Sequence, residues 1–393
     1  MKPHTLPVLV VHSSAELYGS DKSLLDFVRL RPAHMVLTVV LPEQGPLVAA
    51  LRDCGVEVLV GEVCKLQRTM QSPAGLWQLV VSAHATLQFL RGLHRQRRFR
   101  LVYSNSVAVL GGALFALRSG LPHVWHVREI AAGKSALSLV FRKMVRWLSR
   151  RVICNSGQTQ AWIADGGPAH TSLYVTVWNG VDVAPPGADR DAARRSLGAA
   201  PGELLFVLAG RINGWKGQQL LVQAFSALVR QDVGNARLAI VGSPFAGQEQ
   251  WAQQLQAAVA ASGCAALIGV HPFRTDMDAV WTAADVVVVP STDPEPFGRV
   301  AVEAMAFARP VIAAAHGGLV EIVQHGVTGL LVPPRDAAAL TQAMAALAEN
   351  PALRADYGYA GLARQRAVFS VQGYVSRVGA VLDEAAGMAP QTA

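Results

Sequence analysis

Short apolar runs rich in β-branched residues alternate with longer stretches of helical periodicity, and the series occurs twice along the 393 residues. Continuous apolar strands that alternate with helices predict parallel sheets covered by helices on both faces. The sequence therefore predicts two doubly wound, Rossmann-like α/β domains. The expected strands are 7–12, 35–41, 56–60, 101–104, 123–127, 151–154 and 173–178, then 204–209, 236–241, 265–269, 285–290, 310–314 and 329–332.

A segment with two prolines and two glycines separates the two series. It predicts a linker at 179–187 between an N-terminal domain over 1–178 and a C-terminal domain over 188–368. The last helical stretch, 369–386, is expected to form a helix that packs back on the N-terminal domain. With 51% hydrophobic residues, the chain can bury a core in each domain.

Charge is distributed unevenly between the two halves. Residues 1–178 hold 20 Lys and Arg against 9 Asp and Glu, a net charge of +11, whereas residues 179–393 hold 15 against 18, a net charge of −3. A basic excess favours an anionic partner, which can be a nucleic acid, a membrane surface or a phosphorylated ligand. No nucleic-acid motif is present, so nucleic acid is the weakest of these three interpretations.

Basic residues of the first half cluster at 91–100 and 142–151, and the second cluster carries Trp147 and Leu148 among its cations. Such a mixture is typical of a helix that lies on an anionic lipid surface. Solvated helix faces with the apolar members turned to the core explain either cluster alone about equally well. No apolar run is long enough to span a bilayer, and the four separate cysteines indicate a reducing compartment.

Doubly wound sheets bind ligands beyond the carboxyl ends of their strands, so the loops that follow strands are the candidate sites. After the first strand, Gly19 and Ser20 open a helix whose N-terminal N–H groups favour an anion. An ordinary turn capped by Ser20 or Asp21 is at least as good an interpretation. His126 ends a later strand, where a single histidine is either a satisfied core residue or a functional one.

In the second half, Arg211 and Lys216 lie across a glycine-bearing turn that follows the strand ending at Ala209. The planar fork of an arginine, the point charge of a lysine and the positive end of a helix together suit a diphosphate. Two solvated surface cations are the alternative, and the coincidence of three anion-favouring features makes it the weaker one.

The most informative segment runs from Ser291 to Pro310. Glu295 lies in a loop after a strand, Pro296 is expected to start a helix, and Gly298 lets backbone approach a ligand. Glu303 is then expected about two turns into that helix, on an apolar segment where its carboxylate needs a partner. Sugar hydroxyls are suitable partners, because a carboxylate accepts two hydrogen bonds. The alternatives are a helix-capping role for Glu295 and a surface position for Glu303. Each is possible alone, but the two together are a poor explanation.

Together these residues resemble the retaining glycosyltransferases of family four, which have the GT-B fold and include enzymes of bacterial surface-polysaccharide assembly. The central pattern is Glu295, seven residues and Glu303, with Pro-Phe-Gly directly after the first glutamate. Gly210-Arg211 to Lys216-Gly217, the Asn179–Asp182 segment and the glycine-rich run 316–334 follow the family's order. The resemblance covers nearly the whole second half and is looser in the first.

The resemblance implies a role for each matching residue. Arg211 and Lys216 would hold the donor diphosphate, Glu303 the ribose hydroxyls, and Glu295 the donor sugar. His126 would contact that sugar near the reacting carbon, while the 269–273 loop would lie against the base. The implied catalytic residues are His126, Arg211, Lys216 and Glu295; the implied donor-binding residues are Gly19, Ser20, Gly210, Val270, Phe297, Gly298, Arg299 and Glu303.

The resemblance implies transfer of a hexose, with retention, from a UDP- or GDP-linked sugar to a glycan or a lipid-diphosphate-linked acceptor. The family is generally independent of metals, no Asp-x-Asp site is evident, and no cofactor is expected beyond the donor itself. The expected location is the cytoplasm or the inner face of the cell membrane. A nucleotide-sugar epimerase and a non-catalytic nucleotide-sugar-binding subunit are the alternatives, and a dehydrogenase lacks its dinucleotide fingerprint.

Overall fold

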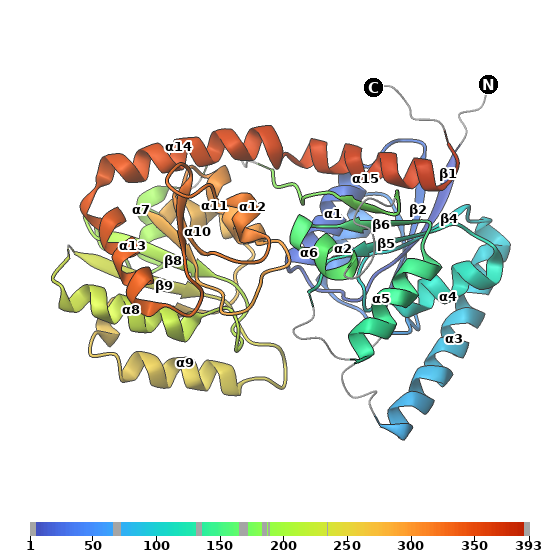
Figure 1. Ribbon diagram of the computed structural model, residues 1–393, viewed down its shortest axis with the longest axis horizontal. Helices are drawn as coiled ribbons and strands as arrows, with labels where there is room; N and C mark the ends of the chain where they lie inside the picture. Colours follow the sequence, from blue (N-terminus) through green and yellow to red (C-terminus); the bar gives the residue numbers. More distant parts are fainter. Residues whose placement is uncertain are drawn as a thin grey trace. The chain divides into compact units, whose positions relative to one another are not determined.

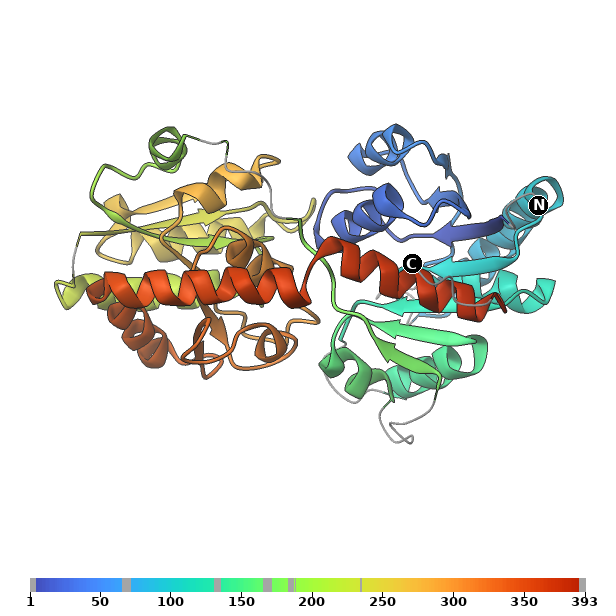
Figure 2. The same cartoon turned by 90° about the horizontal axis from the view of Figure 1, so that it is seen from above.

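The computed structural model of the chain describes residues 5–65, 72–130, 136–164, 172–182, 187, 189–233 and 235–388. The chain divides into two compact units (Figures 1 and 2), the first comprising Met1–Gly180 with Val371–Ala393 and the second comprising Val181–Ser370. Each unit is an α/β domain with one parallel sheet. The prediction of two Rossmann-like domains is therefore confirmed.

The first unit contains a seven-stranded sheet in the order β3-β2-β1-β4-β5-β6-β7. Its strands are β1 Leu6–Val11, β2 Met35–Leu41, β3 Glu57–Val60, β4 Leu101–Ser104, β5 His123–Val127, β6 Arg151–Cys154 and β7 Tyr174–Thr176. Its helices are α1 Gly19–Leu30, α2 Pro46–Asp53, α3 Pro73–Arg97, α4 Leu110–Ser119, α5 Ala136–Leu148, α6 Gly157–Ala164 and α15 Val371–Ala385.

Alternation along β1 shows why this sheet is apolar on both faces. Val8 and Val10 pack in one buried cluster with side chains of α1, α2 and α15, whereas Leu9 and Val11 pack in another with side chains of α3 and α4. Successive side chains of a strand point to opposite faces, so a strand covered by helices on both sides must be apolar throughout. Helices therefore cover both faces of the sheet (Figure 2).

The second unit contains a six-stranded parallel sheet in the order β10-β9-β8-β11-β12-β13. Its strands are β8 Leu204–Ala209, β9 Ala236–Val241, β10 Ile268–His271, β11 Val286–Val289, β12 Val311–Ala314 and β13 Gly329–Val332. Its helices are α7 Arg190–Ser196, α8 Gln218–Arg230, α9 Gln250–Ala260, α10 Met277–Ala283, α11 Arg299–Ala306, α12 Leu319–Ile322, α13 Ala337–Glu349 and α14 Pro351–Val368.

Strand order reverses once in each sheet, between β1 and β4 in the first and between β8 and β11 in the second. In open parallel sheets the crevice at such a reversal is the usual ligand site. The fold thus directs attention to the loops after β1 and β4 and to those after β8 and β11.

The prediction of a strand over 265–269 is wrong in its first half. Ala265–Leu267 form a 3₁₀ turn, and β10 begins only at Ile268. The backbone N–H of Leu267 donates to the carbonyl of Cys264 at 2.9 Å, which closes the turn before the chain can pair with β9. Pairing starts where Ile268 meets Leu238.

The chain leaves the first unit near Gly180 and re-enters it at Val371. On the first-unit side, Asn179 accepts a hydrogen bond from Arg128 at 2.7 Å. On the second-unit side, the backbone of Val181 bonds to Phe369 at 2.9 Å and its carbonyl accepts from Gln365 at 2.7 Å. Within the expected linker 179–187, residues 183–186 lie outside the described residues.

The helix α15 is a component of the first unit's core. Tyr374, Val378 and Leu382 pack in the same buried cluster as β1, and Asp383 pairs with the largely buried His34 at 2.8 Å. Among the helices of the described ranges, none is both long and apolar enough to cross a membrane.

A buried histidine makes the stability of the first unit sensitive to pH. His123 bonds to Ser104 at 2.9 Å and to the Leu148 carbonyl at 3.2 Å, and burial lowers its pKa to about 3. Between the ordinary histidine pKa of 6.5 and the lowered pKa of about 3, His123 binds a proton in the unfolded chain but not in the folded chain. Folding free energy is therefore lost as the pH falls from 6.5 toward 3, with a slope of up to about 1.4 kcal/mol per pH unit.

We expect His123→Gln to reduce this slope, because an amide does not titrate and retains hydrogen-bonding atoms. Urea unfolding at a series of pH values measures the slope. His325→Gln removes an exposed histidine and is the control. An unchanged slope in His123→Gln would contradict the assignment.

Candidate active site

The loops that follow β8 and β11 are bonded together at the carboxyl-terminal edge of the second sheet. The backbone N–H and the hydroxyl of Thr292 both donate to the carbonyl of Trp215, at 2.7 and 3.2 Å. Lys216 Nζ lies 2.6 Å from Glu295 Oε1, and Ser291 Oγ donates to the same oxygen at 2.6 Å. The structure thus brings two of the predicted catalytic side chains into direct contact.

A turn fixes Lys216 in this position. The side-chain oxygen of Asn213 accepts from the backbone N–H groups of Trp215 at 3.1 Å and of Lys216 at 3.0 Å. Such an Asx turn sets the backbone without a regular element. The Lys216 ammonium also lies 4.5 Å from the ring centroid of Trp215, where a cation–π contact is favourable. Lys216 remains partly exposed, so its charge is accessible to an anion.

Arg211 begins the same loop and lies against an aromatic ring. Its guanidinium carbon is 3.2 Å from the ring centroid of Phe245, which stands in the loop after β9. The Arg211 carbonyl accepts from the side chain of Gln218, the first residue of α8, at 2.9 Å. Arg211 and the N-terminus of α8 are thereby tied to one loop, and both supply positive charge there.

A third loop supports Glu295, which is almost fully buried. The backbone N–H of Gly318 donates to the Glu295 carbonyl at 2.7 Å, and His316 Nε2 lies 2.8 Å from the Ser291 carbonyl. A Cβ at Gly317, which has φ of 59°, would overlap the backbone of Glu295. The glycines after β12 thus allow this close approach.

Glu303 has a partner within the protein. Its Oε1 accepts from Arg299 Nε at 2.8 Å, and both side chains are largely buried. The helix begins at Arg299 after Gly298, whose φ is 104°. The prediction of a start at Pro296 is therefore wrong, and Glu303 lies about one turn into α11 rather than two. The predicted need for a partner is met by a cation on the preceding turn.

Three further predicted donor residues of this unit are Phe297, Gly210 and Val270. Phe297 is buried and packs edge-on against Phe369 at 6.1 Å, so only its backbone is available to a ligand. Gly210 follows β8 and bonds to the Val241 carbonyl at 2.9 Å, and Val270 lies half-buried in β10.

The other three predicted residues, Gly19, Ser20 and His126, lie in the first unit. The helix α1 begins at Gly19 with Tyr18 as its N-cap, so the alternative prediction of Ser20 or Asp21 as the cap is wrong. Asp21, at the third helical position, folds back to accept from the Tyr18 N–H at 3.0 Å and pairs with the buried His12 at 2.7 Å.

His126 is fully buried at the carboxyl end of β5. Its Nδ1 lies 2.7 Å from the Tyr103 hydroxyl and 3.3 Å from Arg128, while its Nε2 has no hydrogen-bond partner in the described part of the chain. Burial, and then the charge of Arg128, hold its pKa well below the usual range. The satisfied-core interpretation of His126 is therefore incomplete, because one ring nitrogen lacks a partner.

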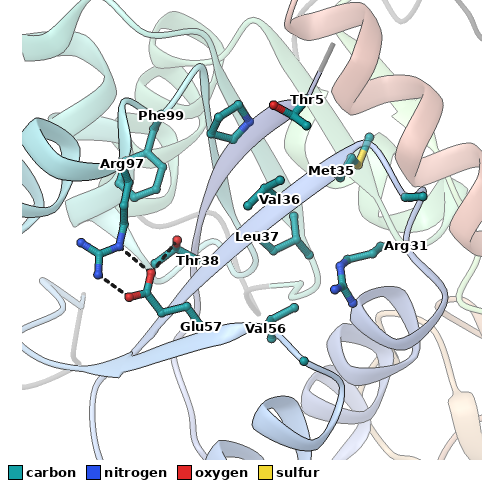
Figure 3. A pocket seen from close by; sticks show the side chains of 13 residues that line it. Thr5, Arg31, Met35, Val36, Leu37, Thr38, Val56, Glu57, Arg97 and Phe99 are labelled. Atoms are coloured by element: carbon teal, nitrogen blue, oxygen red, sulfur yellow. Dashed lines mark hydrogen bonds and ion pairs between the residues drawn. The ribbon is translucent and has the colours of Figure 1, made fainter. Parts of the chain in front are cut away.

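A pocket of about 540 Å³ lies at the opposite edge of the first sheet (Figure 3). It is lined by the amino-terminal ends of β1 and β2, including Thr5, Met35 and Val36, and by the Glu57–Arg97 ion pair. Arg97 lowers the pKa of Glu57. The lining contains none of the predicted site residues. Across the described ranges, no three His, Cys, Asp or Glu side chains are grouped as metal ligands.

Comparison with known families assigns both halves of the chain. Residues 189–364 match the family described as "Glycosyl transferases group 1", and residues 38–185 match "Glycosyltransferase Family 4". Together the two matches span most of the chain. Residues 189–364 therefore form a domain of the group 1 type and residues 38–185 belong to a domain of the family 4 type, and both units have the Rossmann-like fold of GT-B structures.

Individual relatives agree with this assignment. The D-inositol 3-phosphate glycosyltransferase of Nocardia farcinica is 37% identical over 209 residues, 50% of this chain and 46% of the relative. That of Pseudarthrobacter chlorophenolicus is 40% identical over 206 residues, 49% of this chain and 48% of the relative. The chain thus spans about half the length of these curated relatives. HepE of Anabaena, in a crystal structure with UDP and glucose, is 26% identical with a TM-score of 0.82, covering 96% of this chain and 99% of HepE.

The close approach of the two loops beside Lys216 depends on Gly217. This residue has φ of 79°, and a Cβ there would overlap the carbonyl oxygen of Pro290. Gly263 has a similar φ of 76°, but a Cβ at Gly263 would meet nothing within 4 Å, which makes this glycine a matched control.

We expect Gly263→Ala to lower the free energy of unfolding by about 1 kcal/mol, from backbone conformation alone. Gly217→Ala should cost about 1–3 kcal/mol more, because the loops must also move apart. Urea denaturation measures both, and equal losses would show that the contact at Pro290 is unimportant.

Proposed function

We propose that the chain is a retaining glycosyltransferase that transfers a hexose from a nucleotide diphosphate sugar to a phosphate-bearing or glycan acceptor. The observation that carries the proposal is the Lys216–Glu295 pair at the β8/β11 reversal, beside the N-terminus of α8. The group 1 and family 4 domains support it, as does the similarity to HepE, whose crystal structures include UDP, glucose and UDP-glucose.

The cations of this loop suit a departing diphosphate. As the bond between the anomeric carbon and the diphosphate oxygen breaks, its electron pair passes to the diphosphate. Lys216, Arg211 and the N-terminal N–H groups of α8 then stabilise the added negative charge. These groups are held in place before the ligand binds, so little reorganisation is needed as charge develops. The proposed mechanism uses these protein groups as counter-charges, without a metal or a cofactor.

Glu295 is suited to hold the donor sugar. Lys216 and Ser291 both bind its Oε1, and the proposal assigns its Oε2 to a sugar hydroxyl. Backbone N–H groups at Phe297 and Gly298 would add donors on the same loop. In the proposed reaction the acceptor hydroxyl attacks the face from which the diphosphate departs, and its proton passes to a diphosphate oxygen. This order of events retains the anomeric configuration without an enzymic nucleophile.

Glu303 is proposed to accept from the two ribose hydroxyls. Its pairing with Arg299 orients the carboxylate. Arg299 donates to Oε1, and the proposal assigns Oε2 to the ribose. A screen of UDP-linked and GDP-linked donors identifies the nucleotide. The HepE complexes, which contain UDP, favour UDP.

The acceptor is proposed to carry phosphate. The basic excess of the first half favours an anionic acceptor, and two kinds fit: a lipid-diphosphate-linked glycan of surface-polysaccharide assembly and a phosphorylated polyol. The second is favoured by relatives named D-inositol 3-phosphate glycosyltransferases. Offering each acceptor with the same donor separates them.

The first unit is also proposed to contact the anionic inner face of the cell membrane. On α5, Trp147 is 84% and Val140 64% exposed, and on α3 Trp77 is 69% exposed. Lys143 and Arg146 are exposed on α5 between these apolar residues. Apolar side chains with interleaved cations fit an interfacial helix. The four free cysteines support a reducing, cytoplasmic location.

Three arginines of the two basic clusters already contact other side chains of the first unit. Arg97 is paired with Glu57, Arg151 pairs with Glu384 at 3.4 Å, and Arg142 is buried with its guanidinium 5.2 Å from the Trp162 ring centroid. These three arginines of the two basic clusters are therefore engaged within the first unit.

Lys216→Met tests the diphosphate assignment. We expect kcat/KM for transfer from UDP-glucose to fall by about 10²–10³-fold, because one preorganised cation is lost from the leaving group. Arg230→Met, at the far end of the same helix α8, is the control and should retain normal turnover. Near-normal transfer by Lys216→Met would remove the assignment.

The double substitution Val140→Ser with Trp147→Ser tests the membrane contact. We expect its co-sedimentation with vesicles of phosphatidylcholine and phosphatidylglycerol to fall strongly, since the apolar anchor is lost while the cations remain. Tyr359→Ser removes an exposed aromatic residue of the second unit and should bind as the wild type does. If the wild-type protein does not co-sediment with these vesicles at low salt, the membrane contact is refuted.

A further inference from the structure

His126 has two ring nitrogens in different surroundings, and the difference decides which one carries the proton. On one side, the Tyr103 hydroxyl lies 2.7 Å and Arg128 Nη2 lies 3.3 Å from Nδ1. On the other side, Nε2 is buried and has no partner among the residues described. A neutral imidazole has one donor nitrogen and one acceptor nitrogen, so these contacts select between two tautomers.

Arg128 fixes the choice, because a guanidinium can only donate. Its Nε donates to Asn105 Oδ1 at 2.8 Å, its Nη1 to Asn179 at 2.7 Å and its Nη2 to Tyr374 at 2.9 Å. The guanidinium is thus held in one orientation, with Nη2 toward His126. A proton on Nδ1 would face this cation, whereas a lone pair on Nδ1 accepts from it.

Tyr103 acts in the same direction. Its hydroxyl can donate to Asn105 Oδ1 at 3.1 Å or to His126 Nδ1 at 2.7 Å. Asn105 Oδ1 already accepts from Arg128, and the histidine is the nearer acceptor. Burial raises the pKa of Tyr103, so its hydroxyl keeps its proton and remains a donor.

The surrounding charges also keep the ring neutral. The groups nearest to it are Tyr103 from β4, Arg128 after β5 and, through Arg128, Tyr374 from α15. The His12–Asp21 pair is separated from it by Asn105, which bonds to His12. No carboxylate contacts the imidazole within the described ranges, so nothing there favours a second proton.

We propose that Arg128 and Tyr103 hold His126 as the neutral tautomer that carries its proton on Nε2, and that His126 therefore acts on the donor sugar as a hydrogen-bond donor rather than as a base. This inference rests on the proposed function for the identity of the acceptor, which is a sugar oxygen. Arg128 and Tyr103 are positioning residues, since they act through the histidine. The unpartnered Nε2–H then recognises a ligand atom with a free lone pair, and it cannot remove a proton from the acceptor substrate.

Imidazole ¹⁵N spectra test the tautomer in the full-length protein without substrate. We expect Nδ1 to be unprotonated and Nε2 protonated across about two pH units around the ordinary histidine value. Loss of the signal in His126→Gln assigns it. A protonated Nδ1, or an imidazolium at neutral pH, would overturn the proposal.

Two variants test the positioning residues. In Tyr103→Phe the ring stays in the core while one donor to Nδ1 is lost, and in Arg128→Gln both the cation and the competition for Asn105 are lost. We expect a signal from protonated Nδ1 to appear in each, most strongly in Arg128→Gln. Tyr103→Phe supplies the test if Arg128→Gln fails to fold. Spectra identical to the wild type in a folded variant would show that these residues do not set the tautomer.

The role as a donor is tested by replacing His126 with two side chains of similar size. Glutamine offers an N–H near the position of Nε2, and methionine offers none. We expect His126→Gln to retain about tenfold more kcat/KM for the donor than His126→Met, the ratio typical of one hydrogen bond. Equal losses would overturn the donor role. The spectra decide the tautomer even if no sugar is transferred, so a failure of the proposed function is distinguishable from a failure of this inference.

Discussion

The reversal of strand order between β8 and β11 is the constraint on which the candidate donor site depends. The chain leaves these neighbouring strands toward different helices, α8 and α11, so both loops begin side by side at the carboxyl-terminal edge of the sheet. Lys216 and Glu295 occupy those loops and meet there. Lys216 and Glu295 are 79 positions apart in the sequence, and the reversal makes the strands before them neighbours.

Buried charge explains why these side chains are paired with each other. An isolated carboxylate at the position of Glu295 would be costly, and Lys216 with Ser291 removes that cost. The pairing also sets what a ligand must do. In the proposed donor complex, a diphosphate that draws Lys216 away would leave the Glu295 carboxylate in need of donors, and sugar hydroxyls would supply them. The phosphate and sugar ends of one molecule can therefore satisfy both members of the pair, whereas inorganic phosphate satisfies only one.

Both sheets could be predicted from the sequence because strands covered on two faces are apolar throughout, as Val286–Val289 shows. The start of α11 could not be placed from Pro296, since the chain passes through Gly298 in a left-handed conformation before it becomes helical. The Arg299–Glu303 pair was accessible to sequence reasoning, because residues four apart share a helix face. The surroundings of His126 were not, because they come from residues as far apart as Tyr103 and Tyr374.

The same limitation applies to charge. A net charge of +11 over residues 1–178 does not say how many cations are available to a partner. Arg128 is bound inside the first unit by neutral groups, Arg97 and Arg151 are held by carboxylates, and Arg142 lies against an aromatic ring. The exposed apolar residues of α3 and α5 therefore support the proposed membrane contact more specifically than the net charge does. Cations attract any anion, but burying a side chain such as Trp147 is favourable only where another apolar surface covers it.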